Sequence, residues 1–286
     1  MIEQELLSPS IQYIINGLKV EANRSPWALV RLLEQAGVTE KELQPWADFA
    51  HPAEDSYGRK LVYADHGFEV MVMSWQPGDF SAIHDHGYTQ WGAVQIFGPA
   101  EHATFRIEDN KLETTARWQV VPGSILPVQH DLIHQMGNPS QQPFLSLHIY
   151  GLEEEVASIT GDARLFDPVQ AKIQRVDGGV FFALPPDQIS KIEQGYLGDY
   201  PTRLRYLVED VSRKLKMPAY QQGTKAAALE VTIQEIFDGA FMSHCKALKG
   251  GEIPADAVLA QELRAAEKLW QKLGAKYQLP TTVLEC

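Results

Sequence analysis

The chain has 286 residues, of which 44% are hydrophobic and 22% are charged, as in an ordinary soluble globular protein. Its formal net charge of −12 repels phosphate backbones, so nucleic-acid binding is not expected. No apolar run approaches the roughly 18 residues that a membrane span needs, and no basic run points to an anionic membrane surface. The composition therefore predicts a soluble globular protein that binds neither nucleic acid nor a membrane.

The two cysteines, Cys245 and Cys286, do not make a disulfide framework. The first 20 residues carry acidic side chains and no uninterrupted apolar core, so a signal peptide is not expected. Together these features predict a cytoplasmic protein.

Residues 1–50 have a helical pattern. Ser25 can cap a helix, Pro26 suits its first position, and Gly37 suits its C-terminal cap. Apolar residues follow at helical spacing between these caps: Leu29, Leu32, Leu33 and Ala36.

Residues 57–185 change to a β pattern, in which short apolar runs alternate with turn residues such as Asp109-Asn110 and Pro122-Gly123. The predicted strands are residues 68–75, 91–97, 103–107, 118–121, 144–150 and 179–183. Many short strands with turns between them predict a β-sandwich or a barrel.

Residues 200–286 return to a helical pattern. One apolar stripe contains Leu204, Leu207, Val208 and Val211. Two more helices are predicted over residues 226–241 and 254–277, separated by the break at Lys249-Gly250-Gly251. We therefore expect one domain over residues 1–195 and a helical extension over residues 196–286.

The most informative motif is His84-Asp85-His86. Residues two apart on a strand point to the same face, so both imidazoles can share one ion. Asp85 would face the other way and could orient a ligand as a hydrogen-bond acceptor. A third ligand could come from His130 or His134. A single His-x-His pair is more often an ordinary surface or core feature, so the second half of the pattern matters.

Both halves together resemble the paired motifs of the cupin superfamily. The first half runs from Gly78 through His84-Asp85-His86 to Gly98, twelve residues after His86. The second half has Pro122-Gly123 and later His134, with Asn138 four residues on. The resemblance implies a mainly β cupin fold, a double-stranded β-helix or jelly-roll barrel, with N-terminal helices and a C-terminal helical extension.

One departure concerns the fourth ligand. The usual cupin glutamate lies seven residues before the closing glycine, and this chain has Trp91 there. Three neutral histidines leave three positions open on an octahedral ion, which suits non-haem Fe(II). Zinc, nickel and manganese remain possible from the ligands alone.

Two further segments resemble cysteine dioxygenase type I and its bacterial thiol dioxygenase relatives. The first is Tyr57-Gly58-Arg59, and the second places Ser146, His148 and Tyr150 at alternate strand positions. The resemblance covers about residues 57–150, with weaker similarity out to about 182.

The resemblance implies a role for each matching residue. The metal ligands for Fe(II) are His84, His86 and His134, and the hydrogen-bonded catalytic relay is Ser146, His148 and Tyr150. Arg59 would pair with the substrate carboxylate, and Tyr57 would line the same pocket. Trp91 stands where the animal-type enzymes have a cysteine crosslinked to tyrosine, so Tyr150 should be unmodified and Trp91 should reshape the substrate pocket.

The implied reaction joins dioxygen to the sulfur of a small thiol carboxylate and gives a sulfinic acid, without an organic cofactor. Arg59 favours cysteine over 3-mercaptopropionate. The alternatives are a cupin dioxygenase or isomerase with a non-thiol substrate, and a non-catalytic cupin that binds a metal or small molecule. The oligomeric state and the purpose of the helical extension stay open.

Overall fold

The structure is a computed structural model that describes residues 7–20, 24–65, 67–153, 158–182, 184–220, 222–236, 242–254 and 257–277. The chain forms two compact units. Unit 1 contains Met1–His102, Gln119–Leu165 and Gln174–Lys191, and unit 2 contains Ala103–Trp118, Phe166–Ile173 and Ile192–Cys286. The single boundary after residue 195 stays a prediction, because the two units are each assembled from several segments. None of the described helices has both the length and the apolar character that crossing a membrane requires.

Unit 1 begins with helices whose ends follow from local sequence. They are α1 (Pro9–Leu18), α2 (Pro26–Ala36) and α3 (Glu40–Leu43), followed by the short 3-10 helix η3 (Gln44–Trp46). The predicted helix is confirmed as α2, where the Ser25 hydroxyl accepts the Ala28 N–H and Gly37 has a φ of 61°. The apolar faces of α1 and α2 are buried.

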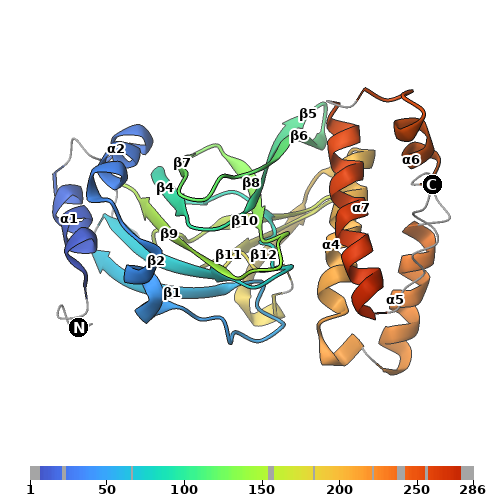
Figure 1. Cartoon of the computed structure of the whole chain (residues 1–286), viewed down its shortest axis with the longest axis horizontal. Helices are drawn as coiled ribbons and strands as arrows, with labels where there is room; N and C mark the ends of the chain where they lie inside the picture. The colour runs from blue at the N-terminus through green and yellow to red at the C-terminus, as the bar shows by residue number, and fades with distance from the viewer. Residues whose placement is uncertain are drawn as a thin grey trace. The chain divides into compact units, whose positions relative to one another are not determined.

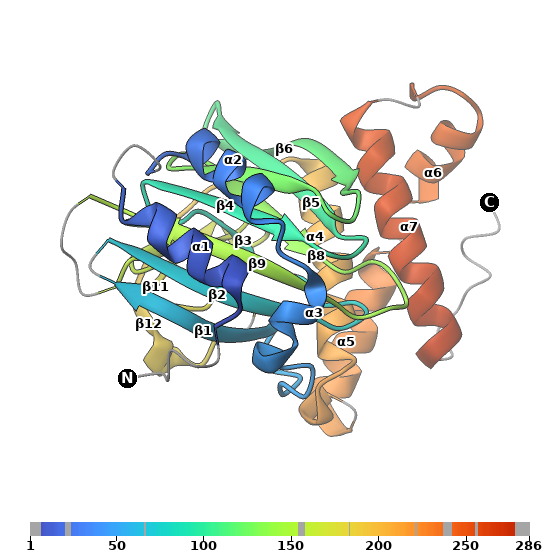
Figure 2. The same cartoon turned by 60° about the vertical axis from the view of Figure 1, so that its left-hand side comes forward.

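The first sheet of unit 1 is antiparallel where its register is defined, and its strand order is β1-β2-β9-β4-β7. Its strands are β1 (Gly58–Asp65), β2 (Phe68–Trp75), β9 (Phe144–Gly151), β4 (Trp91–Ile96) and β7 (Ile125–Gln129). Figure 2 shows α1 and α2 across one face of this sheet.

Strict alternation divides the side chains of this sheet between its two faces. Toward the helices, a core cluster contains Phe68, Val70, Val72, Trp91, Ala93, Leu145, Leu147 and Ile149. Toward the interior, a second cluster contains Met71, Met73, Val94, Ile96 and Tyr150. One face therefore anchors the helices, and the other is available for a site.

The second sheet contributes the strands that carry the histidines. Within unit 1 its order is β12-β11-β10-β3-β8. These strands are β3 (Ile83–His84), β8 (Ile133–Gly137), β10 (Ala163–Asp167), β11 (Lys172–Val176) and β12 (Ile189–Gln194), and the last three continue into unit 2 or begin there. The register of β3 with β8 sets His84 opposite His134.

Unit 2 combines a hairpin with helices. The hairpin of β5 (Glu101–Glu108) and β6 (Lys111–Gln119) turns at Asp109 and Asn110, which both have positive φ as a type I′ turn requires. Strand β13 (Leu197–Gly198) pairs with β6. The helices are α4 (Tyr200–Lys214), α5 (Gly223–Ile236), α6 (Met242–Lys249) and α7 (Val258–Tyr277), with short 3-10 turns at Pro186–Gln188 (η4) and Pro218–Tyr220 (η5).

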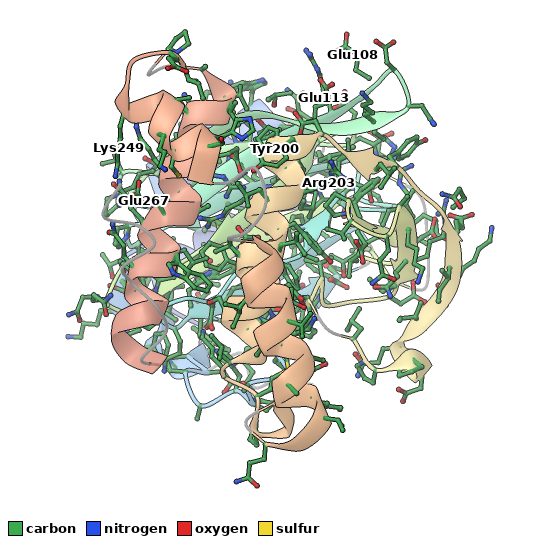
Figure 3. All side chains as sticks on the ribbon, turned by 90° about the vertical axis from the view of Figure 1, so that its right-hand side faces the viewer. Glu108, Glu113, Tyr200, Arg203, Lys249 and Glu267 are labelled. Carbon is green, nitrogen blue, oxygen red and sulfur yellow. The ribbon has the colours of Figure 1, made fainter. Side chains whose placement is uncertain are left out.

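Charged side chains are buried inside unit 2. Arg117 Nε lies 2.6 Å from Glu262 Oε1, and Arg205 Nε lies 2.5 Å from Glu209 Oε1. Figure 3 shows Lys249 and Glu267 on neighbouring helices, where their side chains are 3.8 Å apart. The predicted apolar stripe of α4 is confirmed at Leu204, Val208 and Val211, which are buried.

The cupin fold with N-terminal helices and a C-terminal helical extension is confirmed (Figure 1). Four predicted strands are confirmed, as β2, β4, β5 and β9. The strand expected over residues 118–121 is wrong in its span, because β6 begins at Lys111 and ends at Gln119. The strand expected over residues 179–183 is also wrong where it is described, since residues 179–182 are irregular; residue 183 lies outside the described residues.

The helical extension also differs in detail from the expectation. Helix α5 ends at Ile236, and the predicted continuation over residues 237–241 lies outside the described residues, as does Cys286. Helix α6 was not predicted. Its sequence is short and mixed in polarity, so it has little periodic pattern of its own.

Trp91 supplies a test of the division between the two faces of the first sheet. Its side chain is 3% exposed in the helix-side cluster, so Trp91→Ala should lower the free energy of unfolding by about 3–5 kcal/mol. Urea denaturation measures this loss. Trp27→Ala is the control, because Trp27 is 59% exposed, and it should change stability by less than about 0.5 kcal/mol. Equal effects of the two substitutions would contradict the buried position of Trp91.

Candidate metal centre

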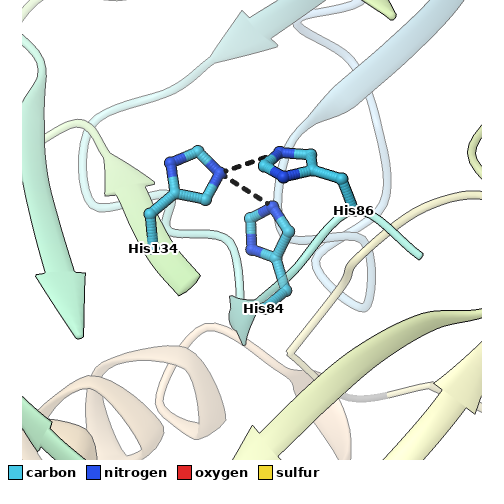
Figure 4. Close-up of side chains that lie close together, drawn as sticks. All are labelled: His84, His86 and His134. Carbon is cyan, nitrogen blue, oxygen red and sulfur yellow. Dashed lines mark hydrogen bonds between the residues drawn. The ribbon is translucent and has the colours of Figure 1, made fainter. Parts of the chain in front are cut away.

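Three histidine rings converge in the interior of unit 1. The Nε2 atom of His134 lies 3.1 Å from Nε2 of His84 and 3.1 Å from Nε2 of His86, as Figure 4 shows. His84 ends β3, His86 follows two residues later, and His134 comes from β8. The three side chains are buried and form the one three-residue metal-ligand group found among the described residues.

The spacing and the protonation of these rings fit a divalent cation. Burial lowers the pKa of His84 to about 4 and holds the pKa values of His86 and His134 well below the usual value, so all three are neutral at pH 7. Neutral imidazole is the form that binds a metal. Nitrogen ligands at about 2.1 Å and right angles around one ion lie about 3.0 Å apart, close to the observed spacing.

The tautomer of His84 also fits the binding of a cation. Its Nδ1 lies 2.8 Å from the Ala82 carbonyl oxygen, which can only accept, so the proton is on Nδ1. In the neutral ring, Nε2 then carries a lone pair directed toward His134. An ion bound between the three Nε2 atoms would be coordinated by all three rings. The three-histidine group is therefore a metal-binding site.

Two other expected ligand-shell residues lie elsewhere. His130 is not part of the three-histidine group, and its Nδ1 lies 2.8 Å from the Thr89 carbonyl oxygen. Asp85 does not accept from a ligand imidazole in the described structure: its carboxylate accepts from Arg164 Nε at 2.5 Å and from two backbone N–H groups. The expected orienting role of Asp85 is therefore wrong. Its position between two inward ligands turns it toward Arg164.

A chain of hydrogen bonds leads along the inner face of β9 to the pocket. Trp75 Nε1 lies 2.8 Å from Ser146 Oγ, which lies 2.7 Å from His148 Nε2. His148 Nδ1 lies 2.8 Å from the Tyr150 hydroxyl. The alternate spacing therefore brings Ser146, His148 and Tyr150 into contact, and the Tyr150 and His86 rings are 5.3 Å apart.

The donor at one end fixes the direction of every bond in this chain. The Trp75 indole can only donate, so Ser146 accepts from it and its own proton goes to His148 Nε2, the acceptor available in the described structure. His148 then carries its proton on Nδ1 and donates to Tyr150. The Tyr150 O–H remains as a donor toward the pocket. Burial, with a smaller effect of Tyr57, raises the pKa of Tyr150, so the phenol stays protonated.

Two of the predicted substrate-binding residues, Tyr57 and Arg59, line one pocket with His84 and His86. The lining includes Tyr57, Arg59, Met71, Met73, His84, His86, Tyr150, Thr160 and Val180. Arg59 donates to the Thr160 hydroxyl at 3.2 Å, and Thr160 in turn bonds Glu69. The Tyr57 hydroxyl accepts the Val180 N–H at 3.1 Å, and burial raises the pKa of Tyr57 to about 12. Thr160 and Glu69 were not singled out from the sequence, because an isolated threonine or glutamate has no motif.

Trp91 is not in this pocket, and the expectation that it reshapes the pocket is wrong. It pairs with Gly151 on β9 and packs on the helix side of the sheet. The next residue, Gly92, is the one opposite Tyr150. A Cβ atom at Gly92 would lie 3.0 Å from Tyr150 Cδ1, so this glycine leaves room for the phenol ring. Whether Trp91 or Gly92 lies opposite Tyr150 depends on how β4 pairs with β9. Counting residues back from Gly98 in the sequence cannot reveal this pairing.

The fold and the three buried imidazoles define a cupin with a three-histidine metal centre. Residues 28–152 match the family model for cysteine dioxygenase type I, so the predicted resemblance is confirmed over that segment. The zebrafish (Danio rerio) protein cysteine dioxygenase type 1 is 31% identical over 114 residues. That similarity covers 37% of this chain and 57% of the zebrafish protein, so the chain spans little more than half of that relative's length.

Solved structures are similar at a greater distance. A conserved protein from Klebsiella pneumoniae with this domain is 16% identical, with a TM-score of 0.30 over 38% of this chain and 85% of that chain. A putative sugar phosphate isomerase from Acidithiobacillus ferrooxidans is 16% identical, with a TM-score of 0.35 over 55% and 90%. Likenesses at these scores are too distant to assign an activity.

The lowered pKa values predict that the metal-free protein loses stability in acid. The pKa of His84 is about 4 and that of His148 about 3, both lowered first by burial, against 6.5 when unfolded. Below 6.5 the unfolded chain binds protons that the folded protein excludes. The free energy of unfolding should therefore fall from pH 6.5 to about 4, by about 1.4 kcal/mol per pH unit and group.

Urea titrations of metal-free protein at several pH values measure this loss. His51 works in the opposite direction, because burial, which lowers its pKa, is outweighed by the combined effects of Asp79, the Pro52 carbonyl and Asp48, so that its pKa is raised; it is a single group. His148→Gln should reduce the pH dependence, since glutamine does not titrate. Stability that is flat between pH 6.5 and 4 would contradict buried neutral imidazoles.

Proposed function

We propose that this protein is an Fe(II)-dependent thiol dioxygenase that converts a small thiol carboxylate, with L-cysteine favoured, into its sulfinic acid. The observation that carries the proposal is one pocket in which two histidines of the three-histidine centre, a guanidinium and a buried phenol meet. The match of residues 28–152 to the cysteine dioxygenase type I family supports it. The reaction adds both atoms of O2 to the thiol, RSH + O2 → RSO2H, so no reductant or organic cofactor is consumed.

His84, His86 and His134 would hold the iron. Three protein ligands leave neighbouring positions open, and bound Fe(II) would supply coordination positions for sulfur and for dioxygen. The neutral donors add no negative charge, which favours binding of an anionic thiolate. We also propose the cytoplasm as the compartment, because a reducing environment keeps the thiol substrate reduced.

Arg59 is suited to hold the substrate carboxylate. A guanidinium offers a planar pair of donors that matches a carboxylate. Arg59 donates a hydrogen bond to Thr160, which in turn bonds Glu69. These bonds hold one side of the guanidinium, so that less conformational entropy is lost when the carboxylate binds. The pocket is narrow, with a cavity volume of about 20 Å³, so any substrate that it takes must be small.

Tyr150 is suited to donate a hydrogen bond to the reacting atoms. The His148 Nδ1–H already occupies one acceptor position of the phenol oxygen, and the hydroxyl proton is directed away from it. The raised pKa keeps this proton on the phenol. Tyr150 therefore acts as a donor that His148 and Ser146 orient.

Thiol-dependent oxygen uptake tests the proposed function. Protein loaded with Fe(II) is mixed with L-cysteine, 3-mercaptopropionate or cysteamine, and oxygen consumption is compared with sulfinate formation. We expect one sulfinate per O2, and the highest kcat/KM with L-cysteine. Uptake with a non-thiol substrate alone would favour another cupin oxygenase, and tight thiol binding without turnover would indicate a binding protein. Either result would end this proposal.

Arg59→Ala tests the assignment of the carboxylate site. A charge-assisted hydrogen bond contributes about 1.5–3 kcal/mol, so KM for L-cysteine should rise by about 10- to 100-fold. KM for cysteamine, which lacks a carboxylate, should change little, and iron content should stay at the wild-type level. Lys60→Ala is a matched control, because Lys60 is a neighbouring cation whose side chain is 53% exposed. Equal rises for both thiols, or loss of iron, would make Arg59 a structural residue.

A further inference from the structure

The second ring nitrogen of each metal-ligating histidine has a different environment. His84 Nδ1 bonds the Ala82 carbonyl oxygen at 2.8 Å. His86 Nδ1 is buried without a hydrogen-bond partner among the described residues. His134 Nδ1 lies 2.7 Å from Nε2 of a fourth histidine, His102, which is also buried. A ligand imidazole in proteins usually donates this second N–H to a carboxylate, a carbonyl or water, so an imidazole partner is unusual.

Metal binding determines which ring donates. Nε2 of His134 is directed at the Nε2 atoms of His84 and His86, so it must keep its lone pair to bind an ion. The proton of neutral His134 is then on Nδ1, and it is donated to His102 Nε2. His102 consequently accepts through Nε2 and carries its own proton on Nδ1. The two rings meet edge to face, with centroids 5.0 Å apart.

We propose that His102 is a positioning residue for the metal centre. It accepts the Nδ1 proton of His134, and so fixes both the tautomer and the rotation of that ligand. A carboxylate in this place would give the ligand anionic character, whereas a neutral imidazole orients it without adding charge. The centre then keeps the full positive charge of its ion for an anionic ligand. This inference concerns metal binding and does not depend on thiol oxidation.

Metal affinity of three variants tests the proposal. Full-length metal-free protein is titrated anaerobically with Fe(II), and separately with Co(II), against a chelator of known affinity. His102→Leu removes the acceptor and should weaken binding by about 10- to 100-fold, the usual effect of losing such a partner. His102→Gln places an amide oxygen near the position of Nε2 and should keep affinity within a few fold. His130→Leu is the control for losing a nearby histidine, since His130 bonds the Thr89 carbonyl instead, and should bind as wild type.

Rescue by glutamine separates positioning from packing. Wild-type affinity in His102→Leu, or equal losses in His102→Leu and His102→Gln, would overturn the proposal. Thermal unfolding of the metal-free variants shows whether they fold. If the leucine variant does not fold, ¹⁵N NMR of histidine-labelled wild-type protein loaded with diamagnetic Zn(II) decides: His134 and His102 should both be Nδ1–H tautomers. An Nε2–H tautomer at His102 would overturn the assignment whether or not the protein oxidises thiols.

Discussion

The constraint on which the site depends is the meeting of three uncharged imidazoles in a dry interior. Their Nε2 atoms lie at ligand spacing, and the one tautomer that a carbonyl fixes directs a lone pair toward the others. Metal binding needs a lone pair on each of the three Nε2 atoms, whereas without the ion a proton on one Nε2 can be shared with a neighbouring ring. A bound ion adds its binding free energy to the stability of the folded protein.

The five-stranded sheet separates an apolar face, which packs against the helices, from a polar face, which is directed toward the pocket. On β9, the apolar residues Leu145, Leu147 and Ile149 face the helices, and the alternate residues face the pocket. Burial of α1 and α2 against this sheet stabilises the strand whose other face is polar. Every polar group of that face is then satisfied by a neighbour, from Trp75 through to Tyr150, so burial of the relay costs little.

The spacing of residues along one strand was sufficient to predict much of the site. The register between neighbouring strands could not be predicted from the sequence. The alternation of Ser146, His148 and Tyr150 places them on one face whatever their neighbours do. The face of Trp91 depends on where β4 pairs with β9, and a difference of one residue reverses it. His102 lies just after Gly98, outside the motif, and meets His134 only through the fold. The capped helix α2 was predictable because its stop and start residues are local.

The two hydrogen-bond chains that end at the centre differ in what they can do. The chain that begins at Trp75 starts with a group that only donates, so its polarity is fixed and it delivers an O–H donor to the pocket. In the hydrogen bond between His134 and His102 both partners are imidazoles, and either could donate. The ion that His134 binds decides which of them does. Loss of the ion would remove the reason for His134 to keep its proton on Nδ1. The donor side of the pocket is therefore preorganised by the protein itself, whereas the ligand side is completed only when the metal binds.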